Sequence, residues 1–217
     1  MSESITIDSV FLNFGQQEVL KGIHLNFAAG QVTGILGRNG CGKSCLLKII
    51  TGQLRAQSSH IRYQERKLEN LYKVPRLINY APQHEFHPQS LRLNQLLAFY
   101  DIDQAAFLAQ YPFLAEKIDD RFYTLSGGER RLVEVLLVLE SDTKFSILDE
   151  PFTHVMPKHV ELLQERILAL KEKKGILITD HQYENVMEIS DRMYLIAEGV
   201  AREVKGTEGL RSYGYLR

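Results

Sequence analysis

A glycine-rich stretch of eight residues constrains this chain more than any other feature. Residues 37–44 read Gly-Arg-Asn-Gly-Cys-Gly-Lys-Ser, after the short apolar run 32–36 and at the start of a helical pattern that stops at Gly52. This is the phosphate-binding loop pattern G-x-x-x-x-G-K-[ST] in its required strand–loop–helix context. Glycines let the backbone wrap an anion, so that N–H groups at the helix N-terminus point at phosphate oxygens. A glycine turn with a chance lysine is the alternative, and this context disfavours it.

The loop predicts individual roles for its side chains. Lys43 is expected to reach the β- and γ-phosphates of a nucleotide, and Ser44 offers a hydroxyl group to Mg²⁺. The expected contacts with the nucleotide are Gly37, Asn39, Gly40, Cys41, Gly42, Lys43, Ser44 and Cys45. The two cysteines fit a reducing compartment better than a disulfide framework, and redox sensing by them is a weaker hypothesis than two small residues beside a turn.

A second apolar strand, 145–148, ends on the carboxylates Asp149 and Glu150. Open α/β sheets bind their ligands at the carboxyl ends of their strands. Asp149 is therefore expected to hold Mg²⁺ through water, and Glu150 to polarise an attacking water as a general base. An isolated Asp-Glu pair would usually be a solvated strand end, but the phosphate-binding loop upstream reverses that preference.

Hydrophobic patterning predicts an α/β core with a parallel sheet, because buried strands alternate with helices. The polar–apolar alternation of residues 5–27 indicates antiparallel strands, and residues 59–81 read as further short strands. The period is helical from about 91 to 122, which predicts an inserted helical subdomain. Further expected elements are a helix at 129–140, a helix that begins at Pro157 and a buried strand at 176–179.

Charge and hydropathy exclude several classes of protein. The formal net charge is −1, so the chain lacks the excess of lysine and arginine that a nucleic-acid partner requires, and none is expected. The apolar run 135–139 is far shorter than the roughly 20 residues of a membrane span. The N-terminal sequence has no signal-peptide character, so we expect a cytoplasmic protein that reaches a membrane only through a partner.

The segment Leu125-Ser126-Gly127-Gly128-Glu129 decides between families of phosphate-loop proteins. A Ser-Gly-Gly sequence that opens a helix is itself an anion site, and one chain does not need two such sites. With this segment the sequence resembles the ABC ATPase family over nearly its whole length, with the motifs in family order. The resemblance implies that Ser126, Gly127, Gly128 and Glu129 cap the γ-phosphate of ATP that is bound by an opposite subunit.

The resemblance also implies a fold. We expect a single domain over residues 1–217, with a P-loop NTPase core of mixed and mostly parallel sheet and an antiparallel β subdomain. The RecA-like core is expected to comprise 1–82 and 126–217, and the inserted helical subdomain about 83–125. The implied cofactors are ATP and Mg²⁺. The implied partner is a second cassette, as a homodimer or a heterodimer.

Three further residues match positions that carry chemistry in the family. Phe14 stands where the family stacks an aromatic ring on adenine, although it could simply be a strand-end aromatic in the core. Gln83 matches the glutamine that contacts Mg²⁺ or the attacking water. His181 matches the histidine that meets the γ-phosphate. Outside this context, Gln83 would be an exposed loop residue and His181 a capping histidine.

The chain departs from the family pattern after Pro151. The family usually reads T-S-A-L-D there, whereas residues 152–156 read Phe-Thr-His-Val-Met. Met156 cannot replace the charge of the aspartate through which the two ATP sites communicate, although the groups needed for hydrolysis remain. A metal site at His154, Met156 and His159, or at His84 and His87, is not supported by spacing. Arg130 and Arg131 are interpreted as a solvated helix face.

The function that this pattern favours is the ATP-hydrolysing subunit of an ABC transporter. No membrane span is fused to the cassette, so a separate permease is expected, with the cassette peripheral on the cytoplasmic face of the membrane. The segment 117–124 also lacks the stretch that precedes the signature in many fused exporters. Two alternatives stay open: a soluble ABC ATPase in assembly or repair, and a slowly hydrolysing nucleotide switch.

Overall fold

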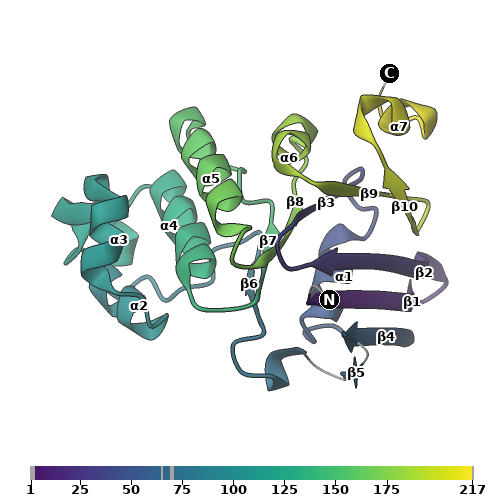
Figure 1. Cartoon of the computed structure of the whole chain (residues 1–217), viewed down its shortest axis with the longest axis horizontal. Coiled ribbons are helices and arrows are strands. Elements are labelled where there is room, and N and C mark those ends of the chain that lie inside the picture. The colour runs from purple at the N-terminus through teal and green to yellow at the C-terminus, as the bar shows by residue number, and fades with distance from the viewer. Residues whose placement is uncertain (1–2, 65, 69–70, 217) are drawn as a thin grey trace.

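The computed structural model describes residues 3–64, 66–68 and 71–216. Two sheets share the middle of the molecule with helices on their flanks, and a group of short helices lies at one end (Figure 1). The strands are β1 (Ser4–Phe14), β2 (Gln17–Ala28), β3 (Val32–Leu36), β4 (Ser58–Tyr63), β5 (Arg66–Lys67), β6 (Ile78–Ala81), β7 (Phe145–Asp149), β8 (Gly175–Thr179), β9 (Arg192–Ala197) and β10 (Val200–Val204). The α-helices are α1 (Lys43–Ile50), α2 (Leu93–Phe99), α3 (Gln104–Gln110), α4 (Gly127–Glu140), α5 (Pro157–Leu170), α6 (Tyr183–Ile189) and α7 (Gly206–Ser212).

The larger sheet has the strand order β10-β9-β3-β8-β7-β6. Strands β9, β3, β8, β7 and β6 run parallel to one another, and β10 pairs antiparallel with β9. Every residue of β3, β7 and β8 is buried, as expected for parallel strands that are covered on both faces. The predicted α/β class with a mixed, mostly parallel sheet is confirmed.

The smaller sheet is antiparallel, with the order β2-β1-β4-β5. Its strands β1 and β2 pair from Ser4 with Ala28 to Phe14 with Gln17, and register shifts interrupt the ladder. Side chains of β1 alternate in burial near its start, where Ile5 and Ile7 are buried and Thr6 and Asp8 are not. This alternation is the period-2 pattern from which antiparallel strands were predicted.

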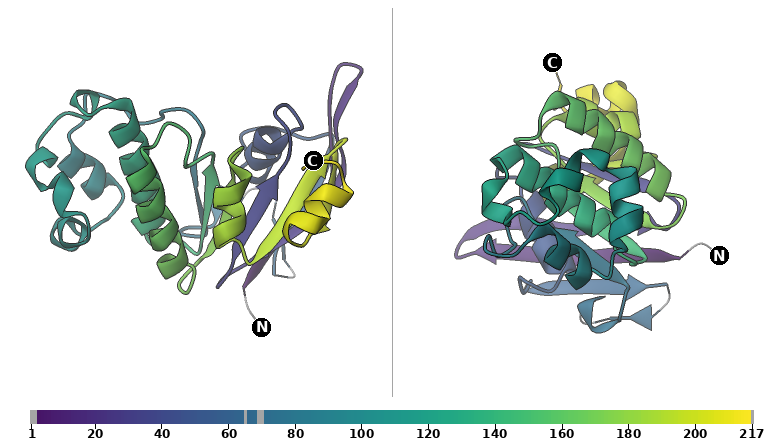
Figure 2. Two further views of the ribbon diagram at one scale, coloured as in Figure 1. Left: turned by 90° about the horizontal axis from the view of Figure 1, so that it is seen from above. Right: turned by 90° about the vertical axis from the view of Figure 1, so that its left-hand side faces the viewer.

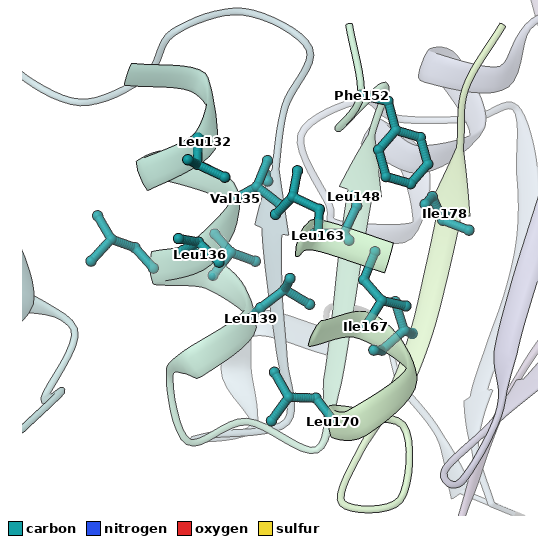
Figure 3. Close-up of a cluster of buried hydrophobic side chains, with 14 of the residues drawn as sticks. Leu132, Val135, Leu136, Leu139, Leu148, Phe152, Leu163, Ile167, Leu170 and Ile178 are labelled. Carbon is teal, nitrogen blue, oxygen red and sulfur yellow. The ribbon is translucent and has the colours of Figure 1, made fainter. Parts of the chain in front are cut away.

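Two hydrophobic clusters form the core. One joins the antiparallel strands and α1 to the large sheet, through residues such as Leu25, Leu46 and Ile147. In the other, α4 and α5 pack together on the sheet, where side chains of both helices meet Leu148 of β7 and Ile178 of β8 (Figure 3). This second cluster continues into Leu93, Leu96 and Leu97 of α2 and Phe107 of α3.

The short helices α2 and α3 lie at the opposite end of the molecule from α7 (Figure 2). The helical pattern at 91–122 is divided between them and 3₁₀ turns at Pro112–Lys117 and Phe122–Thr124. The division of the chain at residues 83 and 125 stays a prediction. Within the described part of the chain, no helix combines the length and the apolar character that crossing a bilayer requires.

The sequence patterns missed the elements that follow His181. Strands β9 and β10 form a hairpin whose two turn residues, Glu198 and Gly199, have φ values of 54° and 81°. Positive φ at both positions is typical of the tightest hairpin turns, but Glu-Gly is a weaker signal than Asn-Gly or Asp-Gly. The short helices α6 and α7 carry too few turns for a clear helical period.

Candidate nucleotide-binding site

The phosphate-binding loop joins the carboxyl end of β3 to α1, at the centre of the large sheet. Two of its glycines have no room for a side chain. A Cβ atom on Gly37 would lie 2.7 Å from the carbonyl oxygen of Ile196, and one on Gly42 would lie 2.7 Å from Leu20. Gly42 also has a φ of 103°, in the left-handed region, where it caps α1. Close packing therefore requires glycine at both positions, and the backbone conformation also favours glycine at position 42.

Lys43 is held by its own loop. Its ammonium group is buried and donates hydrogen bonds to the carbonyl oxygens of Gly37 at 2.7 Å and Arg38 at 3.3 Å. Carbonyl oxygens of the same loop thus hold a positive charge next to the N-terminus of α1, which itself favours anions.

Asp149 lies at the carboxyl end of β7 and is 1% exposed. One carboxylate oxygen accepts a hydrogen bond from the Tyr80 hydroxyl group at 3.0 Å, and the other lies 3.5 Å from the Ser44 hydroxyl group. Burial raises the pKa of Asp149, the opposite of the effect of these hydrogen bonds. Carboxylate and hydroxyl oxygens beside a phosphate-binding loop are donors that suit Mg²⁺. Tyr80 was not predicted, because a tyrosine in a buried strand reads as core.

Glu150 has a φ of 53°, an uncommon conformation for a residue with a side chain. Its backbone N–H group donates to the carbonyl oxygen of Thr179 at 2.7 Å. Its Oε2 atom accepts a hydrogen bond from Gln83 Nε2 at 2.8 Å and lies 3.4 Å from the Thr153 hydroxyl group and 3.6 Å from His181 Nδ1. Residues from three separate loops thus converge on one carboxylate oxygen.

Glu150 and the three side chains that converge on it line a cleft of about 650 Å³, together with Lys43 and Ser44. The Phe14 ring is 53% exposed, so it is available to a ligand rather than buried in the core. The cleft is lined by Phe14, Gln17, Val19, Asn39, Gly40, Gly42, Lys43, Ser44, Cys45, Gln83, Glu150, Thr153 and His181. Cys41, which was predicted to contact the nucleotide, lines a different cavity, together with Arg38 and the segment 213–215.

The interpretation of Arg131 as part of a solvated helix face was wrong. Its guanidinium group is buried and donates to the carbonyl oxygens of Pro82 at 2.6 Å, Asp149 at 2.6 Å and Glu150 at 3.2 Å. Desolvation lowers its pKa. Arg130 is half-buried and donates from Nε to Glu85 at 2.8 Å. Consecutive residues of a helix point in directions about 100° apart, so one of the pair faces the sheet edge.

The residues Ser126–Glu129 do not line the cleft of their own chain. Ser126 caps α4 and exchanges hydrogen bonds with Glu129, in the reciprocal arrangement known as a capping box. A hydrogen bond from Lys117 lowers the pKa of Glu129 to about 2. A Cβ atom on Gly128 would lie 2.8 Å from the carbonyl oxygen of His154, so the start of α4 packs closely against the atypical loop 152–156.

The histidines outside the cleft have other contacts. His87 lies between Glu134, whose Oε1 is 3.3 Å from Nδ1, and the Tyr100 hydroxyl group, 2.9 Å from Nε2. His159 stacks on Phe113 with ring centroids 5.5 Å apart. Among the described residues, no group of three or more His, Cys, Asp or Glu side chains is arranged to hold a metal ion.

Comparison with known proteins identifies the family. The model of the family described as "ABC transporter" matches residues 20–153, more than half of the chain. The chain belongs to the ABC transporter family.

Relatives in this family cover most of the sequence. An ABC protein of Acidithiobacillus ferridurans, the lipopolysaccharide export system ATP-binding protein LptB, is 31% identical over 92% of this chain and 88% of its own length. The probable branched-chain amino acid transport ATP-binding protein LivF of Archaeoglobus fulgidus is 30% identical over 88% of each chain. A solved structure of an ATP-binding subunit of an ABC transporter superposes with a TM-score of 0.83 at 21% identity, over 97% of this chain and 93% of the other. At that identity the superposition shows the fold alone.

Proposed function

We propose that this chain binds ATP with Mg²⁺ and hydrolyses it, and that hydrolysis energises a separate membrane permease. The observation that carries the proposal is the convergence of Gln83, Thr153 and His181 on one oxygen of Glu150, in the cleft that the phosphate-binding loop lines. A single carboxylate that faces an anion site from the end of a buried strand is suited to activate a water molecule.

Each part of the cleft has a role in this proposal. Phe14 stacks on the adenine ring, and the backbone of the loop with Lys43 binds the phosphates. Lys43 exchanges its bonds to Gly37 and Arg38 for bonds to phosphate oxygens. The oxygens of Ser44, Gln83 and Asp149 would hold Mg²⁺, which would neutralise negative charge on the phosphates.

Glu150 then accepts the proton of the attacking water. Gln83 and Thr153 fix the direction of its carboxylate before substrate binds, which lowers the cost of orientation in the transition state. His181 is 45% exposed on its side chain, and it lies close enough to Glu150 to meet the same phosphate. Arg131 fixes the backbone on which Asp149 and Glu150 stand.

The site is completed by a second cassette. Ser126 and Gly127 are exposed at the N-terminus of α4 and take no part in the cleft of their own chain. The N-terminus of a helix is an anion site, so a second copy or a related cassette supplies this group to the bound ATP. ATP closes the dimer and hydrolysis opens it.

A surface for the permease lies beside the helical end. A groove of about 330 Å³ runs between β6 and the end of α2, and Phe99 at its edge is 78% exposed. Aromatic residues are enriched at protein interfaces, so an exposed ring at the edge of a groove supports an interface here. The relatives are named for lipopolysaccharide export and branched-chain amino acid transport, which supports a transport role for this chain as well.

The test uses the variant Glu150→Gln, which keeps the size of the side chain and one acceptor oxygen and removes its basicity. We expect this variant to bind ATP with about wild-type affinity, to hydrolyse it at least about 100-fold more slowly and to accumulate as a dimer in size-exclusion chromatography. Lys43→Ala is the matched control, because it should lose ATP binding and stay monomeric. Normal turnover in Glu150→Gln would remove this residue from catalysis.

The same variant identifies the partner. Tagged Glu150→Gln is expressed in the native organism, trapped with ATP and purified from membranes and cytosol. A stoichiometric protein with several membrane spans, identified by mass spectrometry, supports the permease. Recovery of soluble partners or of the cassette dimer alone would replace the transport role with that of a soluble ABC ATPase.

A further inference from the structure

The proposed mechanism does not use His87, although its imidazole ring is buried and fully bonded. Nδ1 lies 3.3 Å from Oε1 of Glu134, and Nε2 lies 2.9 Å from the hydroxyl group of Tyr100. Glu134 belongs to α4 and its side chain is fully buried, whereas Tyr100 caps the C-terminus of α2. One ring therefore joins α4 to the helical end of the molecule, with one hydrogen bond from each nitrogen.

The partners of Glu134 Oε1 determine which ring nitrogen carries the proton. This oxygen also accepts the backbone N–H groups of Phe86 at 3.0 Å and His87 at 3.3 Å. An acceptor oxygen requires a donor, so the proton lies on Nδ1 of the neutral ring and Nε2 is the acceptor. The Tyr100 hydroxyl group then donates to Nε2. Burial raises the pKa of Tyr100, so the hydroxyl group keeps the proton that it donates.

The Glu134 carboxylate depends on these bonds for its position. Among the described residues, its Oε2 atom has no hydrogen-bond partner, and Arg131 Nη1 lies 3.9 Å from it. The rings of Phe86 and Phe122 flank His87, with centroids 4.1 and 6.0 Å from its own. A carboxylate buried beside apolar groups is costly unless it is hydrogen-bonded. Loss of the bond from His87 would therefore favour another position of Glu134.

Helix α4 holds the segment that contains Gln83 at both ends. Arg131, one turn before Glu134, donates to the carbonyl oxygen of Pro82 at 2.6 Å. Glu134 accepts the two backbone N–H groups at the other end of the segment. Gln83 lies between these ties and donates to Glu150 Oε2 at 2.8 Å. The position of Glu134 thus helps to determine where Gln83 meets the catalytic carboxylate.

We propose that His87 is a positioning residue, which fixes the segment that carries Gln83 through Glu134 and is itself oriented by the Tyr100 hydroxyl group. This inference rests on the proposed hydrolysis of ATP. His87 does not line the cleft, so it acts on the rate of hydrolysis through Gln83 and not by contact with the nucleotide. Tyr100 also lines the groove beside Phe99, so an occupant of that groove can alter hydrolysis by moving one side chain.

The first experiment compares Tyr100→Phe with Tyr111→Phe in steady-state ATPase assays. Tyr100→Phe keeps the ring and removes the hydroxyl group, so kcat should fall about 3- to 10-fold, the range expected for one lost hydrogen bond, with KM within about 2-fold. The Tyr111 hydroxyl group is the matched control, because it donates to Glu140 on the same helix and Tyr111 is also buried. Tyr111→Phe should leave kcat within about 2-fold, because Glu140 holds no part of the cleft.

A double-mutant cycle tests whether the effect passes through Gln83. In a Gln83→Ala background, Tyr100→Phe should change kcat by less than about 2-fold, because the side chain that it positions is already absent. A general loss of stability would instead lower kcat by the same factor in both backgrounds. Equal effects in the two backgrounds, an equal fall in Tyr111→Phe, or a wild-type kcat in Tyr100→Phe would each overturn the inference.

The orientation of the ring has a spectroscopic test that needs no turnover. NMR of labelled histidine nitrogens should show the proton of His87 on Nδ1 in the wild-type protein, and this preference should weaken in Tyr100→Phe. His87→Asn identifies the signals. A proton on Nε2 in the wild type overturns the inference. Absence of ATPase activity in the wild type would overturn the proposed function while the NMR result stands, so the two failures are distinguishable.

Discussion

The buried side chain of Arg131 connects the loop that carries Gln83 to the end of β7. Its guanidinium group bonds the backbone before Gln83 and the backbone of both carboxylates at the end of β7. Glu134, one turn later on α4, accepts the N–H groups of Phe86 and His87. A buried guanidinium group that loses its partners is costly, so these bonds hold the two loops at a fixed distance.

Replacing Arg131 by lysine is therefore expected to slow hydrolysis. An ammonium group cannot bond three carbonyl oxygens in the fork geometry of a guanidinium group. We expect kcat to fall about 10- to 100-fold, a cost of about 1.4–2.8 kcal/mol in the transition state, while the Kd for ATP stays within about 3-fold. Arg130→Lys, on the same helix and with a more exposed partner, is the control. A wild-type kcat for Arg131→Lys would show that the carbonyl contacts are structural only.

At the scale of single residues, sequence motifs predicted residues that line the cleft. They did not predict the residues that support the cleft from outside. The cleft brings together Lys43, Ser44 and Glu150, which were predicted from motifs, with Gln83 and His181, which were predicted from the resemblance to the ABC ATPase family. Tyr80 and Arg131 were missed, because nothing in a strand or helix pattern tells which polar side chain will meet the end of a neighbouring strand. Their roles depend on how β6 and α4 pack beside β7.

Among the elements, α4 has an unusual cap at its C-terminal end. The Lys174 ammonium group is buried and donates to the carbonyl oxygens of Leu139 and Ser141, both at 2.7 Å. A cation at a helix C-terminus satisfies carbonyl groups that have no partner within the helix. Desolvation nevertheless dominates, and it lowers the pKa of Lys174 from 10.5 to about 8.

This pKa makes stability depend on pH in one direction. Below about pH 8 the lysine is protonated in the folded and the unfolded chain, and the folded state carries the full cost of burying the charge. Between about pH 8 and 10.5 the unfolded state binds more protons, so the free energy of unfolding rises with pH. The shift corresponds to about 3 kcal/mol at most.

The measurement is denaturant unfolding of the wild-type protein and of Lys174→Met across this pH range. The free energy of unfolding of the wild type, relative to the variant, should rise as the pH increases from about 8 to 10.5. The common titration of other groups cancels in the difference. A difference that stays constant with pH would show that Lys174 has an ordinary pKa in the folded protein.

Periodicity predicted most elements of the first 180 residues, because strands buried on both faces and long amphipathic helices leave clear patterns. It predicted less where elements are short. Helices of seven residues such as α2, α3, α6 and α7 complete about two turns. Their positions depend on which side chains the rest of the fold buries, such as Leu210 of α7, and not on the local pattern.

At the scale of the whole molecule, the nucleotide cleft and the groove beside Phe99 are connected by a single strand, β6. Strand β6 lines the groove and leads directly to Gln83 in the cleft. Contacts made in the groove can therefore reach Glu150 through the loop that carries Gln83, over a short length of chain. This arrangement suits a protein whose hydrolysis is linked to movement in a partner.

Phe99→Ser tests this link at the level of the assembly. Phe99 is largely exposed, so its loss should change the free energy of unfolding by less than about 0.5 kcal/mol. Basal ATPase activity should also be unchanged. Recovery of the proposed permease with tagged Glu150→Gln should fall at least about 10-fold when Phe99→Ser is added, as expected for the loss of a central aromatic contact. Leu168→Ser, on the exposed side of α5, is the control; equal losses in both variants would exclude a specific role for the groove.

One hydrophobic cluster joins the helical end of the molecule to α4 and α5, and this limits the exchange of segments between cassettes. Leu93, Leu96 and Phe107 of the helical end are packed in the same apolar cluster as α4 and α5. Residues 83–125 are thus not a detachable module. A chimera that takes this segment from another cassette inherits a mismatched surface unless the facing side of α4 is transplanted with it. The packing of this segment and the stability of the core are therefore inherited together.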